Sequence, residues 1–137
     1  MVIIVISFCL SSCQANQKGY SSDYQKLNST SLDQTRLLAK GTHSYFIAHG
    51  KDETIRIAIE SVKQKLSDPY SAQFENIRLA NFEGLTVVCG QVNAKNKLGG
   101  YTGFTDFVSG VAVIFYKKHE LPEVERERNA GIITACK

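Results

Sequence analysis

The clearest periodic pattern in the chain lies between Asp52 and Pro69. Apolar residues recur there every three or four positions, which is the spacing of one face of an α-helix: Ile55, Ile59, Val62 and Leu66. Asp52 is a favourable N-cap residue, and Pro69 disfavours helical geometry in the residue before it. The pattern predicts one main helix that begins near Asp52, ends at residues 67–69 and packs one face against a core.

Three segments beyond this helix are predicted to be β-strands: residues 77–82, 85–92 and 104–116. Residues 87–88 and 111–115 are apolar at consecutive positions, which is typical of strands that are covered on both faces. Residues 83–84, Glu-Gly, predict a short hairpin turn between the first two strands. Residues 109–110, Ser-Gly, predict a bulge within the third strand.

Shorter elements complete the predicted fold. Residues 71–74 are expected to form one further turn that places Phe74 in the core, and a helix is expected around residues 122–129. Residues 132–136 are interpreted as a last strand that reaches Cys89. The sequence therefore predicts an α+β fold, with one main helix packed on a small antiparallel sheet of three to four strands, in a single domain at residues 41–137.

The first residues of the chain carry a different pattern. Val2 to Leu10 is an almost unbroken apolar run, far shorter than the roughly 20 residues that a membrane-spanning helix needs. Small residues then precede Cys13, in the order Leu-Ser-Ser-Cys, which is typical of the cleavage and lipidation site of a bacterial lipoprotein. We expect residues 1–12 to be a signal peptide and Cys13 to carry the lipid. The alternative is a buried N-terminal strand that happens to end in cysteine.

The lipoprotein interpretation also predicts a location. A lipid on Cys13 would anchor the chain at the periplasmic face of the bacterial envelope, on the outer membrane. Lipoprotein signals normally open with Lys or Arg, whereas residues 1–3, Met-Val-Ile, contain neither. Either the true start lies upstream of Met1 or the signal is an unusually weak one.

Residues 13–40 are predicted to be a flexible tether between the lipid and the domain. Residues 14–30 are rich in Ser, Asn, Gln and Lys and contain few large aliphatic side chains, so they bury too little surface to order themselves. A short helix around Leu32 and Leu38 and a short apolar contact at residues 45–47 are expected to follow, before Gly50 interrupts the chain.

The charge balance argues against a nucleic-acid partner. The chain has 16 Lys and Arg against 13 Asp and Glu, which gives a formal net charge of +3. Nucleic-acid-binding proteins usually concentrate basic residues on one face, whereas here Lys117 and Lys118 are followed at once by several glutamates. Mixed charges of this kind at residues 123–128 are typical of a solvated helix face.

The sequence contains four cysteines, of which two would remain free to pair. Cys9 would leave with the signal peptide and Cys13 would take the lipid, so Cys89 and Cys136 form an even pair in an oxidising compartment. A disulfide between them would close a long loop and stabilise the domain by roughly 4 kcal/mol in the chain-entropy model. Two free buried thiols, or a catalytic pair, are the alternatives.

The most distinctive segment is the glycine-rich stretch at residues 93–104. Its glycines and asparagines tolerate positive φ, so one interpretation is a tight connection between two strands. The other interpretation is a binding loop, in which Lys95 and Lys97 attract anionic groups, asparagines form hydrogen bonds and aromatic rings offer flat apolar area. The residues assigned to this candidate binding loop are Asn93, Lys95, Asn96, Tyr101 and Phe104. The segment has neither the Gly-Lys-Ser/Thr of a phosphate-binding loop nor a dinucleotide fingerprint.

A set of short motifs runs from the main helix to this loop. They are Asp68-Pro69, Ser71-Ala72, Phe74, Val88-Cys89-Gly90, Val92-Asn93, Lys95-Asn96, Gly99-Gly100-Tyr101, Gly103-Phe104 and Phe107. With the C-terminal cysteine, they resemble a family of small, uncharacterised bacterial and prophage-borne envelope lipoproteins. The resemblance covers residues 62–107, and it implies secretion and a compact α+β domain. It implies no reaction and no ligand.

Catalytic signals are weak in this sequence. His43, His49 and His119 are separated along the chain, and none lies in a metal-ligand or nucleophile motif. Asp106 lies near Tyr101, but a lone carboxylate in a strand usually faces solvent. We expect no cofactor and no metal, and interpret the chain as a lipid-anchored binding protein whose partner is an envelope protein or a glycan. The alternatives are a hydrolase of cell-wall material, assembled from distant residues, and a purely structural lipoprotein.

Overall fold

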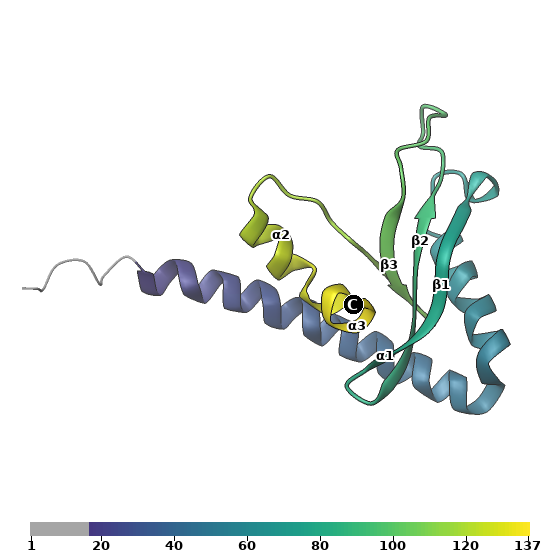
Figure 1. The fold of residues 1–137 in the computed structure, drawn as a ribbon, viewed down its shortest axis with the longest axis horizontal. Helices are drawn as coiled ribbons and strands as arrows, with labels where there is room; N and C mark the ends of the chain where they lie inside the picture. Colours follow the sequence, from purple (N-terminus) through teal and green to yellow (C-terminus); the bar gives the residue numbers. More distant parts are fainter. Residues whose placement is uncertain (1–16) are drawn as a thin grey trace, which may run out of the picture.

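The computed structural model describes residues 17–137, and it shows an α+β fold. The elements are α1 (Gln17–Lys63), the 3₁₀ turn η1 (Pro69–Ser71), β1 (Gln73–Phe82), β2 (Leu85–Asn93), β3 (Thr105–Ser109), β4 (Val113–Phe115), α2 (Pro122–Arg128) and α3 (Ala130–Cys136). The fold class is confirmed, with one long helix against a four-stranded antiparallel sheet (Figure 1). The predicted signal peptide and the lipidation site at Cys13 lie outside the described residues.

The sheet is a simple meander in the order β1-β2-β3-β4, with every neighbouring pair antiparallel. The predicted hairpin turn joins β1 to β2, where Glu83 and Gly84 both have positive φ, of 52° and 81°. Two positive φ values in a two-residue connection match the right-handed twist of the flanking strands. β1 also contains an irregularity between Glu75 and Arg78, where Asn76 has a φ of 55°.

The predicted third strand is wrong in one respect, because the bulge at residues 109–110 is a chain reversal. β3 ends at Ser109 and β4 begins at Val113, and the turn between them meets α1. A Cβ atom on Gly110 would lie 1.9 Å from the hydroxyl oxygen of Thr42 in α1. The hydroxyl of Ser109 donates to the carbonyl of Ala58, also in α1, at 3.0 Å. The segment reverses where a glycine lets it approach the helix backbone.

The long helix α1 bends at Gly50 into two arms. Gly50 has φ 80° and ψ −176°, which interrupts the helical geometry. The first arm, residues 17–49, passes below the sheet, and the second arm, residues 51–63, rises beside it (Figure 1). The prediction of a flexible tether is therefore wrong for residues 17–40, which are helical. No helix within residues 17–137 combines the length and the apolar character needed to cross a membrane.

Small hydroxyl residues explain why the first arm lacks an apolar pattern. Its buried face includes Ser31, Thr35 and Thr42, and each threonine satisfies its hydroxyl within the helix. Thr35 donates to the carbonyl of Ser31 at 3.0 Å, and Thr42 donates to that of Leu38 at 2.8 Å. These short side chains let other elements come close, and a Cβ atom on Gly131 of α3 would lie 1.9 Å from the Thr35 hydroxyl. The first arm is held in place where its small residues allow other elements to pack closely against it.

The bend brings helix onto both faces of the sheet. On one face, which we call face A, the first arm and α3 pack against alternate strand residues, with Leu38 and Ile132 meeting Val87 and Val108. On the opposite face, face B, Val62 of the second arm packs with strand residues such as Phe107. Val87 and Val88 point to opposite faces and both are fully buried, so the prediction of a strand with two covered faces is confirmed for residues 87–88. It is wrong for the start of residues 111–115, because Val111 is 43% exposed in the turn before β4.

Polar contacts fix the angle of the bend. The Tyr45 hydroxyl in the first arm donates to Glu53 in the second arm at 3.0 Å. Arg56 donates to both oxygens of the same carboxylate, at 2.8 and 2.6 Å. These hydrogen bonds, chiefly those from Arg56, lower the pKa of Glu53 to about 2. The two arms therefore meet through an ionised carboxylate beside the bend.

The C-terminal segment is helical, which corrects the predicted last strand at residues 132–136. The β-branched residues there favour a strand, but Ile132 and Ala135 are buried at helical spacing against face A. Packing thus overrides local preference. The predicted helix around residues 122–129 is present as α2, and the buried side chain of Asn129 at its end bonds both backbone groups of Lys117, each at 2.8 Å.

Candidate functional site

The predicted binding loop extends beyond the sheet as the connection between β2 and β3 (Figure 1). It is an ordered hairpin, closed by an antiparallel bridge between Lys95 and Tyr101. Inside it the Asn96 N–H donates to the carbonyl of Gly100 at 2.9 Å, and the Gly99 N–H donates to the carbonyl of Asn96 at 2.9 Å. The loop therefore keeps its shape through its own backbone.

The side-chain oxygens of the two asparagines assigned to binding accept hydrogen bonds from within the loop. The amide oxygen of Asn96 accepts from the N–H groups of Leu98 and Gly100, at 2.9 and 3.2 Å. That of Asn93 accepts from the N–H of Gly103 at 3.1 Å. Asn93 and Asn96 thus build the loop, and their capacity to accept hydrogen bonds from a partner is largely used.

The loop is docked on the η1 turn. The hydroxyl of Tyr101 donates to the carbonyl of Ser71 at 3.2 Å, and the N–H of Lys95 donates to the Ser71 hydroxyl at 2.8 Å. The Lys95 ammonium lies 5.7 Å from the centre of the Tyr101 ring, within the range of a cation–π contact. Asp68 caps η1 by accepting from the N–H of Tyr70 at 3.1 Å.

Four large apolar side chains are left exposed around this docked loop. Leu98 is 94% exposed at the tip, Tyr101 is 47% exposed and Phe104 is 39% exposed, while Tyr70 on η1 is fully exposed. We call these four residues the loop surface. Tyr101 and Phe104 were among the predicted residues, whereas Tyr70 and Leu98 were not. The missed signal was that each is a large apolar residue next to a turn.

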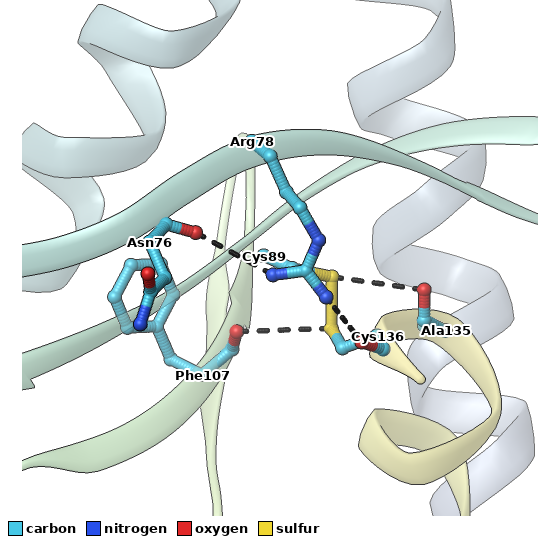
Figure 2. Close-up of a disulfide and its surroundings, with 6 residues drawn as sticks. All are labelled: Asn76, Arg78, Cys89, Phe107, Ala135 and Cys136. Atoms are coloured by element: carbon cyan, nitrogen blue, oxygen red, sulfur yellow. Dashed lines mark hydrogen bonds between the residues drawn. A yellow bond between two sulfur atoms is a disulfide. The ribbon is translucent and has the colours of Figure 1, made fainter.

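The structure confirms the disulfide between Cys89 in β2 and Cys136 at the end of α3, with an S–S distance of 2.03 Å (Figure 2). The Cys89 sulfur is buried and lies 3.7 Å from the carbonyl oxygen of Ala135. The guanidinium of Arg78 crosses above the bridge and donates to the carbonyl oxygen of Cys136. The bond holds α3 against face A.

A groove of about 220 Å³ opens beside the disulfide. One wall is a chain of polar side chains across three strands: Asn76 donates to Gln91 at 2.9 Å, and Gln91 donates to Asp106 at 2.8 Å. Asp106 therefore lies in a partly enclosed site, half-buried, and it does not simply face solvent. The other groove residues include Arg78, Tyr116, Ile132, Ile133 and Lys137.

Two of the three histidines accept backbone hydrogen bonds. The Nδ1 of His43 accepts from the N–H of Thr86 at 3.2 Å, and that of His119 accepts from the N–H of Leu121 at 3.0 Å. The His49 ring lies against the Tyr45 ring, with ring centres 4.2 Å apart and the planes tilted by 34°. Within residues 17–137 no group of three or more His, Cys, Asp or Glu side chains could hold a metal ion.

In comparisons with known proteins, the chain matches no family model, no curated protein and no solved structure. The resemblance to envelope lipoproteins therefore stays a prediction.

Proposed function

We propose that the chain is a lipid-anchored interaction protein of the periplasm, which contacts an envelope partner through the loop surface. One observation carries this proposal: large apolar side chains are exposed on a loop that is held by its own hydrogen bonds. Exposed apolar groups on a fixed support are typical of binding surfaces, because little conformational entropy is lost when a partner binds.

The charges around the loop favour a partner with anionic groups. Lys95 and Lys97 lie on the hairpin, and no carboxylate in residues 17–137 pairs with either of them. Aromatic rings next to unpaired cations form a surface that contacts both flat apolar groups and acids. An envelope protein with an acidic patch, or an acidic glycan, fits this chemistry.

The first arm supports the anchoring part of the proposal. Helix begins at Gln17, four residues after Cys13, and by Asn28 it contacts α2, where the Asn28 amide donates to the carboxylate of Glu127. Residues 17–28 form about 17 Å of helix at 1.5 Å per residue. A stiff spacer of this length would hold the domain away from the lipid headgroups, where a flexible tether was expected.

Photo-crosslinking in the bacterial envelope tests the loop surface. A crosslinking amino acid is placed at Lys97, and capture is compared in the parent chain and in variants Tyr70→Ala and Leu98→Ala, whose side chains make no hydrogen bond in the loop. Leu37→Ala is the matched control, because Leu37 is 75% exposed on the first arm, outside the loop surface. We expect both loop variants to lose the captured product while the control keeps it. Equal capture in all four proteins would reject the loop surface.

Intact mass of the membrane-fraction protein tests the anchor separately. The proposal expects a chain that starts at Cys13 and carries acyl mass. An unmodified chain that keeps Met1 would reject the lipid anchor and the periplasmic location, whatever the crosslinking result.

A further inference from the structure

We propose that the groove beside the disulfide binds a short zwitterionic peptide, a dipeptide in length, with its ammonium group at Asp106 and its carboxylate at Arg78. This site is separate from the loop surface, and the inference holds whether or not that surface meets a partner.

The groove lies on the part of face A that no helix covers. Gln91 and Asp106 are register partners on β2 and β3, and Gln91 shares the face of Cys89 because side chains alternate along a strand. The α3 helix ends at Cys136, where the disulfide joins it to β2 (Figure 2). Residues of this helix end and of the strands line the groove. The groove has an apolar side as well, formed by Ile132 and Ile133.

Asp106 and Arg78 form no ion pair among residues 17–137, and Lys137 is a further charged residue that lines the groove. Asp106 accepts one hydrogen bond, from the neutral amide of Gln91 at 2.8 Å. Arg78 donates to the carbonyl oxygens of Asn76 and Cys136. A half-buried carboxylate favours a cation near it, and the remaining N–H groups of a guanidinium without an ionic partner favour a carboxylate.

The strand register sets how far apart the two charged residues begin. Arg78 is the register partner of Cys89 and Asp106 is that of Gln91, so their backbones are two strand spacings apart across the sheet and two residues apart along it, roughly 12 Å. An extended dipeptide spans about 7 Å, which leaves room for one hydrogen bond at each end. The volume of about 220 Å³ and the isoleucines suit small aliphatic side chains.

Titration of the full chain with alanyl-alanine, followed by amide NMR, tests the proposal. We expect shifts at Arg78, Gln91, Asp106 and Ile133. N-acetyl-alanyl-alanine lacks the ammonium group and alanyl-alanine amide lacks the carboxylate, and each should bind about 5-fold more weakly, because each lacks one partly exposed ion pair. No shift with alanyl-alanine, or equal binding of all three peptides, would overturn the proposal.

Two variants test which side chain binds each end of the peptide. Asp106→Asn keeps an acceptor for Gln91 and should bind alanyl-alanine and its N-acetyl form equally. Arg78→Gln should bind alanyl-alanine and its amide equally. Asp52→Asn and Arg128→Gln remove the same charges outside the groove, and they should leave all three affinities unchanged. Equal losses in the control variants would show a general charge effect and reject the site.

Discussion

Removing the Cys89–Cys136 disulfide is the change whose effect the structure sets most clearly. The bridge joins the second strand to the end of the last helix, and 47 positions separate the two cysteines. The perturbation is the double variant Cys89→Ala/Cys136→Ala. Cys9 and Cys13 are replaced by Ser in the parent and in the variant alike, so that only the bridge differs.

The magnitude follows from the length of the closed loop. In the chain-entropy model, a bridge across 47 positions removes unfolded-state entropy worth about 4 kcal/mol at 25 °C. The total stability of a domain of this size is about 5–15 kcal/mol. The variant should therefore lose a large share of its free energy of unfolding. It should still fold, because Ile132 and Ala135 keep their places in the core on face A.

Urea denaturation followed by circular dichroism measures this loss. The midpoint should fall, and the m-value should rise, because an unfolded chain without the bridge exposes more surface to urea. In reductant, the free energy of unfolding of the parent chain should match that of the double variant to within about 1 kcal/mol. That margin allows for the small change in core volume when Cys is replaced by Ala.

Two results would contradict this expected loss of stability. A loss below about 1 kcal/mol with an unchanged m-value would mean that the bridge does not restrict the unfolded chain. Hydrogen exchange that is fast throughout α3 and unchanged in the sheet would mean that the bridge secures only the last helix, so that its removal causes local unfolding.

Three further changes test the contacts of α1. Gly110→Ala puts a Cβ atom 1.9 Å from the Thr42 hydroxyl and should cost about 1–3 kcal/mol in urea denaturation, whereas Gly100→Ala, whose nearest neighbour would be 3.9 Å away, should cost far less. Gly50→Ala forces a side chain into φ 80° and should lower the free energy of unfolding by about 1–3 kcal/mol in the same assay. The Glu53 pKa is lowered from 4.5 to about 2, so its stabilising effect is complete above pH 4.5 and is lost as pH falls through 2. The difference in melting temperature between the parent and Glu53→Gln should therefore shrink over that range, and a constant difference would contradict the assignment.

The sheet was predictable because its sequence signals agree at every level. Residues 87–88 are apolar at consecutive positions, and residues 83–84 supply a turn that accepts positive φ. A strand buried on both faces needs that composition in any arrangement of its neighbours. The sequence therefore indicated β1, β2 and their hairpin without any knowledge of what covers them.

The first arm of α1 was not predictable from apolar spacing. Its core positions hold Ser31, Thr35 and Thr42, and a pattern of hydrophobic residues counts these as exposed. They can be buried only because each threonine bonds a carbonyl of its own helix and because glycines at 110 and 131 come close to them. These two glycines lie nearly 70 residues or more further along the chain, so the sequence alone does not show that they pack against this arm.

Of the two candidate sites, only the loop could be predicted from the sequence. Its glycines, asparagines and aromatics are contiguous, but the roles of Asn93 and Asn96 depended on backbone geometry. The groove could not be predicted. Its polar residues come from three strands and become neighbours only through the register that pairs Gln91 with Asp106 and through the hydrogen bond from Asn76.

The end of α3 explains why polar residues begin where they do on face A. Along β2 the residues on this face are apolar up to Cys89 and polar at Gln91; along β3 the same change occurs between Val108 and Asp106. Both changes lie at the level where the disulfide fixes the last residue of the helix. The bridge thus sets the boundary between the buried core and the open groove, and it positions one wall of the groove. Any ligand held by Asp106 should therefore bind more weakly once the bridge is reduced, although Asp106 makes no contact with either sulfur.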